Sequence, residues 1–339
     1  MNDLEGMRAA MAAAEAVRGS TESNPSVGAA VLGPDGRWHT GATQPPGQAH
    51  AEIMAMRAAA EAGVDLAGVT VVTTLEPCSF RGRTGSCAVA LVEAGVGRVV
   101  VGMLDPDPRN AGAGVALLRE AGIDVEVGVG ADEVAAQLES YVHWRSTGRP
   151  FVTLKLAATL DGRTAAPDAT SQWITGADAR RDVHRLRARS DGILVGAGTV
   201  RDDDPSLTVR DVEGTDPRRY VAGTAPAGAK VHPCTEVTGE WPDILDRIGA
   251  DGVIDLMVEG GAGVAGELHR QGLVDRYVLY VAPALFGGDD ARPLFVGPGA
   301  STMADLWRGR LVDVRRVGED LALELRPAAA GSTDPVGED

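Results

Sequence analysis

Apolar residues in the first half of the chain recur at spacings that alternate between those of helices and those of strands. Leu4, Met7, Met11, Ala14 and Val17 lie three or four positions apart, which predicts an amphipathic helix over 3–18. The same spacing predicts further helices over 51–62, 86–94, 114–121 and 131–146. Short apolar runs predict strands over 27–32, 69–74, 98–101 and 123–129. Strands separated by helices indicate an α/β fold with a mostly parallel sheet and helices on both faces.

The pattern starts afresh after Gly148-Arg149-Pro150, which we interpret as a domain boundary. Strands are predicted over 151–157, 191–196, 219–222, 253–258, 276–282, 311–317 and 320–326. Helices are predicted over 177–189 and 262–271, whereas 211–240 is rich in Gly, Pro and Thr and is predicted to be irregular. We therefore expect two α/β domains, 1–148 and 149–327, followed by a disordered tail over 328–339.

Composition narrows the classes of function. Lys and Arg number 32 against 48 Asp and Glu, so the net charge is −16, which argues against binding to nucleic acid or a membrane surface. No apolar run reaches the ~18 residues that suggest a membrane-spanning helix, and the acidic start is unlike a secretory signal. Three cysteines are too few for a disulfide scaffold and fit a reducing compartment. We therefore expect a cytoplasmic protein that is neither a nonspecific nucleic-acid binder nor a membrane protein.

Three residues of the first domain have the chemistry of zinc ligands. His50-Ala51-Glu52 opens a predicted helix, Glu76-Pro77-Cys78 follows a predicted strand, and Cys87 comes nine residues after Cys78. One imidazole and two thiolates leave the fourth position of a zinc ion open, where a water molecule is acidified at neutral pH. Glu52, at the head of the helix, is placed to move the proton of that water to a leaving ammonia.

Each of these residues alone has an ordinary interpretation, as a buried cysteine or a surface histidine. His-x-Glu followed by Pro-Cys and a second cysteine is, however, the signature of zinc deaminases, in which the glutamate is an acid–base group and not a ligand. The usual deaminase has two residues between its cysteines, whereas eight residues separate Cys78 from Cys87. The longer spacing therefore distinguishes this chain from the usual zinc deaminase.

Further motifs accompany the ligands. In chain order they are Asn24-Pro25-Ser26-Val27-Gly28, Glu76-Pro77-Cys78-Ser79, Gly82-Arg83-Thr84, Asp105-Pro106-Asp107-Pro108 and Ala111-Gly112-x-Gly114. The set resembles the deaminase half of the bifunctional riboflavin-biosynthesis deaminase–reductases. That resemblance implies a cytidine-deaminase-like mixed sheet with helices on both faces, zinc on His50, Cys78 and Cys87, and proton transfer by Glu52. It also implies deamination of 2,5-diamino-6-(ribosylamino)-4(3H)-pyrimidinone 5′-phosphate, with Asn24 contacting the substrate.

The chain departs from the family pattern beside the expected substrate and not at the metal. The departures are at Thr43, Phe80, Arg81, Gly85-Ser86 and Ala113. We therefore expect the metal chemistry of the family to be retained and the contacts with substrate to differ.

The second domain carries glycine and arginine motifs with two interpretations each. Gly260-Gly261 between a strand and a helix could cradle a phosphate, but a tight turn explains it equally well. No Gly-x-Gly-x-x-Gly opens a helix, so a Rossmann domain is not supported. The arginines within 180–189 ordinarily form a solvated face, although guanidinium groups also match a phosphorylated ligand.

The order of motifs in this domain resembles the reductase half of the same family, whose α/β fold is like that of dihydrofolate reductase. The resemblance implies hydride transfer from NADPH to the ribosyl group, which becomes ribityl. The implied cofactor-binding residues are Ala157, Trp173, Thr199, Asp203, Gly261, Ala262, Gly263, Val264, Ala265, Gly266 and Glu267. The implied substrate-binding residues are Ser171, Arg187, Leu207, Arg210 and Glu259, and Lys155 and Glu259 are the implied catalytic pair.

Together the two halves predict a bifunctional enzyme that uses Zn²⁺ and NADPH, binds phosphorylated pyrimidines and forms a homo-oligomer. The main alternative is a monofunctional zinc deaminase with a non-catalytic reductase-like domain, which the short segment 220–237 favours. A nucleic-acid deaminase is disfavoured by the net charge, and a non-catalytic zinc module would need a fourth protein ligand. The remaining histidines, His184 among them, and Cys234 join no motif and are interpreted as structural or surface groups.

Overall fold

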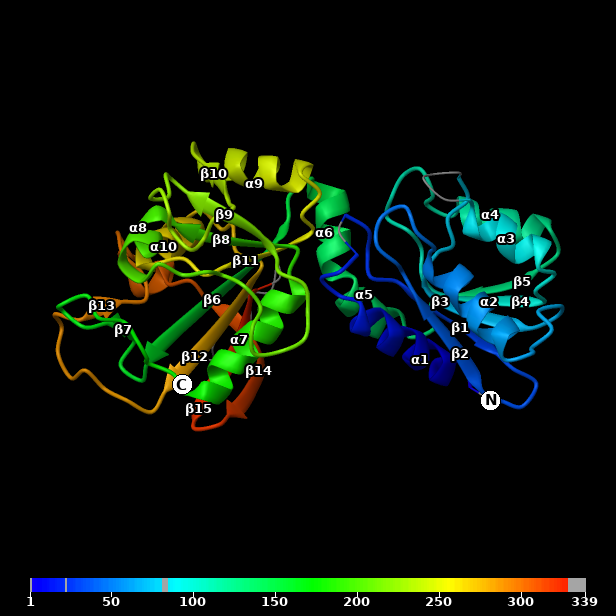
Figure 1. Ribbon diagram of the computed structural model, residues 1–339, viewed down its shortest axis with the longest axis horizontal. Helices are drawn as coiled ribbons and strands as arrows, with labels where there is room; N and C mark the ends of the chain where they lie inside the picture. The colour runs from blue at the N-terminus through cyan, green and yellow to red at the C-terminus, as the bar shows by residue number, and fades with distance from the viewer. Residues whose placement is uncertain (1, 22, 81–84, 329–339) are drawn as a thin grey trace. The chain divides into compact units, whose positions relative to one another are not determined.

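The computed structural model describes residues 2–21, 23–80 and 85–328, which form two units (Figure 1). The first unit takes in the chain up to Pro150 together with Ile248–Ile254, and the second comprises Phe151–Arg247 and the chain from Asp255 onward. The motif Gly82-Arg83-Thr84, the departure at Arg81, and the tail predicted to be disordered, except Ala328, lie outside the described residues.

A mixed sheet forms the centre of the first unit, in the strand order β2-β1-β3-β4-β5. The strands are β1 (Gly28–Leu32), β2 (Trp38–Ala42), β3 (Thr70–Leu75), β4 (Arg98–Met103) and β5 (Asp124–Val127). β1 is antiparallel to β2 and to β3, whereas β3, β4 and β5 run parallel. The central strands β3 and β4 are buried over most of their length and rich in Val and Thr, as expected where a sheet is covered on both faces.

Helices cover both faces of this sheet: α1 (Asp3–Ala16), α2 (Ala51–Glu61), α3 (Cys87–Glu93), α4 (Ala113–Glu120), α5 (Ala131–Gln137) and α6 (Glu139–Thr147). On β1, Gly28 faces the backbone of Ala10 in α1. The next residue pairs with Gly41 of β2, where an added Cβ would lie 2.1 Å from the backbone nitrogen of Ala55 in α2. Successive strand residues point to opposite faces, so α1 and α2 lie on opposite faces, and glycine at position 41 lets α2 approach the sheet closely.

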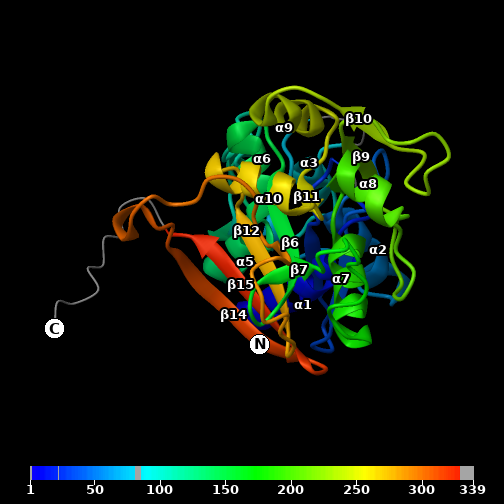
Figure 2. The same cartoon turned by 90° about the vertical axis from the view of Figure 1, so that its left-hand side faces the viewer.

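The second unit is built on a larger sheet, in the strand order β10-β9-β8-β11-β6-β12-β15-β14. Its strands are β6 (Phe151–Thr159), β8 (Gly192–Gly196), β9 (Arg218–Ala222), β10 (Thr235–Val237), β11 (Asp255–Val258), β12 (Arg276–Ala282), β14 (Gly309–Val317) and β15 (Asp320–Pro327). Neighbours run parallel from β10 to β12, while β15 is antiparallel to both β12 and β14. Figure 2 shows β14 and β15 along one side of this unit, with β14 as the edge strand.

The other elements of the second half are the helices α7 (Ala177–Arg189), α8 (Ala197–Asp203), α9 (Trp241–Ala250) and α10 (Ala262–Arg270), the 3₁₀ turn Met303–Asp305, and a small sheet of β7 (Arg163–Ala165) with β13 (Arg292–Pro293). Within the described residues, no helix is both long enough and apolar enough to span a membrane.

Several elements were not predicted, and each miss has a physical reason. β2 contains His39, Thr40 and Gly41, so it lacks an apolar alternation. β10 has three residues, too few to show a period, so the expectation that all of 211–240 outside the predicted strand 219–222 is irregular is wrong. The helix predicted over 131–146 is two helices, α5 and α6, which meet at Leu138.

Candidate functional site

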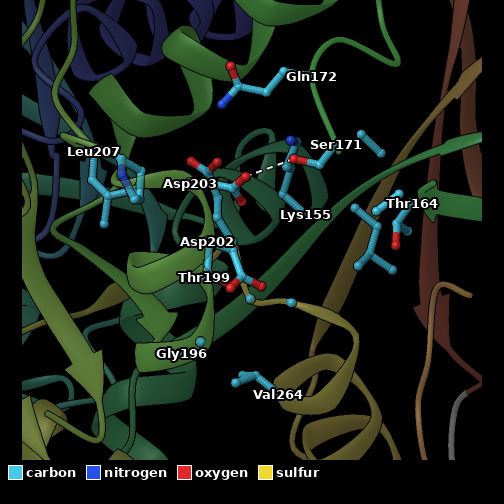
Figure 3. A pocket seen from close by; sticks show the side chains of 18 of the residues that line it. Lys155, Thr164, Ser171, Gln172, Gly196, Thr199, Asp202, Asp203, Leu207 and Val264 are labelled. Atoms are coloured by element: carbon cyan, nitrogen blue, oxygen red, sulfur yellow. Dashed lines mark hydrogen bonds between the residues drawn. The ribbon is translucent and has the colours of Figure 1, made fainter. Parts of the chain in front are cut away.

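A cavity of about 1260 Å³ opens in the second unit (Figure 3). Its walls include the carboxyl ends of parallel strands, because Gly196 ends β8, Ala222 ends β9 and Glu259 follows β11. Open parallel sheets bind their ligands at these ends. The volume exceeds the ~300–1,000 Å³ of ordinary ligand sites, so the cavity is larger than one small molecule needs.

Most residues implied for the reductase line this cavity. They are Lys155, Ala157, Ser171, Trp173, Arg187, Thr199, Asp203, Leu207, Arg210, Glu259, Gly261, Ala262, Gly263 and Val264. Ala265, Gly266 and Glu267 do not line it. Ala265 is fully buried, Gly266 packs on the carbonyl of Val296, and Glu267 pairs with Arg270. The glycine segment therefore meets the cavity only through the start of α10.

A buried ion pair forms one wall of the cavity. The guanidinium of Arg187 donates from Nε and Nη2 to the two carboxylate oxygens of Glu259, at 2.5 and 2.9 Å, and from Nη1 to the carbonyl of Thr208 at 3.2 Å. The side chains of Arg187 and Glu259 are 11% and 12% exposed. Breaking such a buried pair by removing one partner costs about 3–5 kcal/mol. Arg187 therefore holds Glu259 in addition to facing the cavity.

Lys155 lies next to this pair on β6. Burial lowers the pKa of Lys155 below its ordinary value, and the Glu259 carboxylate opposes that shift. Burial alone would raise the pKa of Glu259, but Arg187 and then Lys155 hold it below its ordinary value. The three side chains therefore place one net positive charge at the wall of the cavity when all are ionised.

Ser171 and Asp203 lie at the mouth of the cavity and contact each other, since the Ser171 hydroxyl donates to the Asp203 carboxylate at 2.7 Å (Figure 3). Nearby, the guanidinium carbon of Arg180 lies 4.7 Å from the ring centre of Trp173, whose side chain is largely exposed. These contacts join the segment after β7 to α7 and α8.

The sequence interpretation missed several cavity-lining residues. Gln172, Asp202, Lys230 and His184 were given no role, and His184, interpreted as structural or surface, is buried and accepts the Arg210 N–H at 3.2 Å. One signal was available: the chain contains two lysines, Lys155 and Lys230, and both line this cavity. Elsewhere the chain uses arginine as its basic residue, so these two lysines are the exceptions in the sequence.

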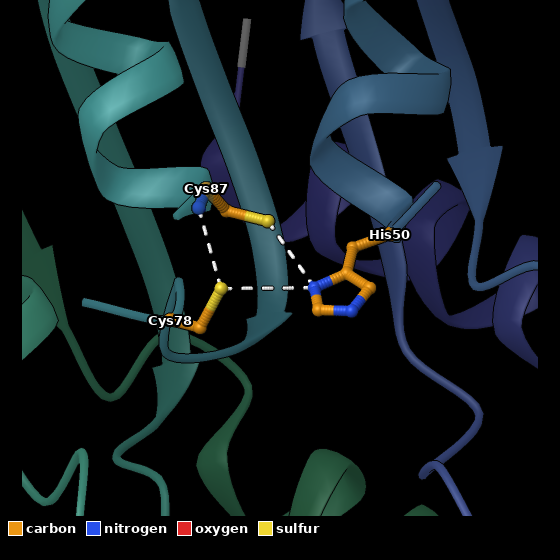
Figure 4. A group of neighbouring side chains, drawn as sticks. All are labelled: His50, Cys78 and Cys87. Atoms are coloured by element: carbon orange, nitrogen blue, oxygen red, sulfur yellow. Dashed lines mark hydrogen bonds between the residues drawn. The ribbon is translucent and has the colours of Figure 1, made fainter. Parts of the chain in front are cut away.

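In the first unit, three elements bring His50, Cys78 and Cys87 together (Figure 4). His50 is the N-cap of α2, Cys78 lies in the turn after β3, and Cys87 is the first residue of α3. The Nδ1 of His50 lies 3.7 Å from the Sγ of Cys78 and 3.3 Å from the Sγ of Cys87. All three donor atoms are within 4.8 Å of one another, and no further His, Cys, Asp or Glu of the described chain joins them.

This donor set fits zinc. Bonds of ~2.1 Å to nitrogen and ~2.3 Å to sulfur in tetrahedral geometry place the two donor types ~3.6 Å apart, close to the distances observed. Hydrogen bonds from Cys87 and His50 lower the pKa of Cys78 to about 4 against the opposing effect of burial, so this sulfur is a thiolate at neutral pH. Glu52, on the first turn of α2, is 4% exposed. Burial and the Cys78 charge raise the pKa of Glu52 to about 7, the range suited to moving protons in both directions.

Other predicted residues of this half lie around the cluster. Asn24 is half-buried in the turn before β1, and its carbonyl accepts the Thr21 hydroxyl at 2.9 Å. Its contact with substrate stays a prediction. Thr43, one of the departures, is buried and bonds to the backbone of Val27. Phe80, another departure, lies under Arg109, with 4.9 Å between the guanidinium carbon and the ring centre.

Family models match both halves. Residues 1–103 match the cytidine and deoxycytidylate deaminase zinc-binding region, and residues 150–323 match the RibD C-terminal domain. The riboflavin biosynthesis protein RibD of Mycobacterium tuberculosis is 41% identical over 327 residues, which cover 91% of this chain and 93% of that protein. The chain belongs to the RibD family. RibD of Escherichia coli is 36% identical over 368 residues, covering 96% of this chain and 99% of that protein.

Solved RibD structures agree over the whole chain. Acinetobacter baumannii RibD superposes with a TM-score of 0.88 at 35% identity and covers 96% of this chain and 99% of that one. The diaminohydroxyphosphoribosylaminopyrimidine deaminase/5-amino-6-(5-phosphoribosylamino)uracil reductase of Thermotoga maritima gives 0.87 at 32% identity, with the same coverage. The predicted family and the predicted fold class of both halves are confirmed.

The zinc site predicts the metal content of variants. We expect about one zinc per chain, from a site with three protein ligands. Cys78→Ser and Cys87→Ser should each lose zinc, because a hydroxyl is a poor replacement for a thiolate, and metal analysis of the purified protein measures this. Cys234→Ser, outside the cluster, is the matched control and should keep its zinc. Zinc retained in Cys78→Ser, or lost in Cys234→Ser, would contradict the assignment.

Proposed function

We propose that the chain deaminates 2,5-diamino-6-(ribosylamino)-4(3H)-pyrimidinone 5′-phosphate in the domain 1–148 and reduces the resulting uracil in the domain 149–327. The enzyme is a bifunctional RibD of riboflavin biosynthesis, with zinc and NADPH as its cofactors. The observation that carries the residue assignments is the presence in one chain of a three-ligand metal cluster beside a buried glutamate and of a cavity lined by a half-buried lysine. The monofunctional alternative is not favoured, because the reductase cavity and its ionised groups are fully formed.

The deaminase step needs a group that moves protons between water and the amino group at C2. Zinc bound by His50, Cys78 and Cys87 supplies the Lewis acidity that brings the pKa of a water molecule towards neutral. The Glu52 carboxylate takes a proton from the attacking water and delivers it to the amino nitrogen, which leaves as ammonia. A pKa of about 7 lets the same carboxyl group do both at neutral pH.

The reductase step opens the ribose ring and reduces C1′. NADPH supplies the hydride. As the bond between C1′ and the ring oxygen breaks, negative charge develops on that oxygen, and the Lys155 ammonium stabilises it and provides a proton. Glu259, held by Arg187, favours the charged form of that lysine, and Arg210 and Ser171 contact the substrate. Ala157, Trp173, Thr199, Asp203 and the start of α10 contact the cofactor.

The substrates are phosphorylated small molecules, and the net charge of −16 leaves no reason to assign a nucleic acid or a membrane as a partner. We place the enzyme in the cytoplasm, because Cys78, Cys87 and Cys234 are all free thiols and two of them must stay reduced to bind metal.

The edge strand β14 supports a homo-oligomer. Every residue from Gly309 to Arg316 is exposed, and Leu311, Val312 and Val314 are 55%, 43% and 52% exposed. The strand also carries Arg310, Asp313, Arg315 and Arg316, and the backbone groups along an uncovered edge strand can pair with another chain. A second copy can pair its own β14 antiparallel with this edge and cover the apolar side chains of both. We therefore assign β14 as the interface between two copies.

Glu52→Gln should lower the rate of deamination about 10²–10⁴-fold, because the amide cannot carry the proton. Zinc content should be unchanged, since Glu52 is not a ligand, and reduction of the supplied uracil should persist. Ammonia release measures deamination, metal analysis measures the zinc content, and NADPH oxidation measures reduction. Glu61→Gln, on the exposed end of the same helix, is the control. Loss of zinc in Glu52→Gln would mean that the residue is a ligand.

Lys155→Ala should lower the rate of reduction about 10²–10³-fold, the usual cost of losing one charge-stabilising group, while ammonia release continues. The wild-type reduction rate should fall as pH rises through the pKa of Lys155, because the protonated form is the active one. Burial places that fall below the ordinary lysine range. The pH profile of NADPH oxidation measures this fall in rate, and Glu52→Gln is a control variant that should show the same fall. If Lys155→Ala shows the fall at the same pH as the wild type, the titrating group is not Lys155.

A charge on β14 should separate the copies. Leu311→Lys combined with Val314→Lys should halve the mass in solution, since lysine on an edge strand opposes pairing, while both activities of each chain are retained. Light scattering after size-exclusion chromatography measures the mass. The control is Val127→Lys on β5, one of the two edge strands of the five-stranded sheet. If only Val127→Lys changes the mass, the interface lies on the first unit.

A further inference from the structure

A buried carboxylate stands two residues before the ligand Cys78. Glu76 directly follows β3 and is 3% exposed. Its Oε2 accepts the backbone N–H groups of Asp105 at 3.1 Å and Gly112 at 2.9 Å, and its Oε1 accepts that of Val115 at 3.0 Å. Charge-assisted bonds of this kind are about twice as strong as neutral ones. Glu76 therefore fastens the turn after β3 to the connection between β4 and α4.

The same connection holds the turn on the other side of Cys78. Asn110 is 1% exposed, and its Oδ1 accepts both the backbone N–H of Ser79 at 2.9 Å and the Ser79 hydroxyl at 2.8 Å. Its Nδ2 donates to the carbonyl of Pro77 at 3.4 Å. At Gly114 an added Cβ would lie 1.9 Å from that same carbonyl, so α4 packs directly on the turn.

The position of the Cys78 sulfur follows from this anchoring. Pro77 and Ser79, the neighbours of Cys78, are both bonded to Asn110, and Glu76 is bonded to two amides of the same connection and to one amide of α4. On the other side, the Cys78 sulfur accepts the Cys87 N–H at 3.2 Å, and its carbonyl accepts the Ser86 hydroxyl at 2.8 Å. Neither Glu76 nor Asn110 is among the three clustered donors, so both act through the turn.

We propose that Glu76 and Asn110 are positioning residues for the metal: they fix the turn 76–79 so that the Cys78 sulfur already lies at bonding distance before zinc arrives. The inference rests on the zinc site of the proposed deaminase. Fixing a ligand in advance removes the entropy that binding would otherwise cost. Partners that orient metal ligands typically change metal affinity or activity about 10- to 100-fold when mutated.

Glu76→Gln separates positioning from simple stabilisation. The amide has the size of the carboxylate but one accepting oxygen, so its NH₂ group must face at least one backbone N–H, donor against donor. A purely structural role would lower the melting temperature of zinc-loaded and zinc-free protein equally. A positioning role lowers the increase in melting temperature that zinc provides, because that increase depends on zinc affinity.

The experiment uses the full chain and three readouts: zinc release to an excess of chelator, melting temperature with and without zinc, and the visible spectrum after cobalt(II) replaces zinc. We expect Glu76→Gln to release zinc about 10- to 100-fold faster, to gain less from zinc on melting, and to show an altered cobalt spectrum. Asn110→Ala, which leaves Glu76 in place, should show the same changes. This variant tests the inference if Glu76→Gln does not fold. Asp3→Asn is the matched control, because Asp3 pairs with Arg98 at the opposite end of β4.

Wild-type zinc release and an unchanged cobalt spectrum in both variants would overturn the inference. The variant Cys78→Ser distinguishes failure of the positioning role from failure of the zinc assignment. If Cys78→Ser loses zinc while Glu76→Gln and Asn110→Ala behave as wild type, only the positioning role falls. If Cys78→Ser keeps its zinc, the zinc site and the inference fall together.

Discussion

β3 and β4 run parallel, with Leu75 opposite Met103, so the chain segments that follow them leave the sheet at the same edge. The first of these segments contains Cys78 and the second contains Asn110. Residues about thirty positions apart in the sequence therefore bond to each other through short contacts between a turn and a loop. In the second unit, the ends of β8, β9 and β11 meet in the same way around the cavity. Parallel pairing thus decides where the functional side chains of each unit gather.

The two sites treat a buried carboxylate in opposite ways. Beside Lys155, Glu259 is paired with Arg187, so this carboxylate stays ionised. At Glu52, burial beside a thiolate makes the charged form costly, so its pKa rises towards neutrality. A carboxylate that offsets neighbouring positive charges must stay ionised, whereas a carboxyl group that exchanges protons must be stable in both forms.

The sequence predicted residue types and order better than it predicted contacts. His50, Cys78 and Cys87 were identified because their spacing is itself a signature, and they do meet. Glu76 lies in the same motif but received no role, because its partners are backbone N–H groups, which any residue at 105, 112 and 115 would offer. Ala265 to Glu267 were assigned to the cofactor as one glycine-rich run, yet helical geometry turns them away after the first turn of α10. Arg187 was expected to hold substrate, and its pairing with Glu259, seventy-two residues later, has no local signal.

The segment Ile248–Ile254 belongs to the first unit although it is encoded within the second. Within that unit the indole N–H of Trp144 donates to the carbonyl of Gly249 at 3.0 Å, and Ile254 is 6% exposed in its apolar core. A single break in the gene near codon 150 would therefore not yield two self-sufficient proteins. The product that contains the first unit would lack Ile248–Ile254, and the product that contains the second unit would carry this segment without the core against which it packs. Separating the two units would therefore require changes within Ile248–Ile254 as well as a cut near residue 150.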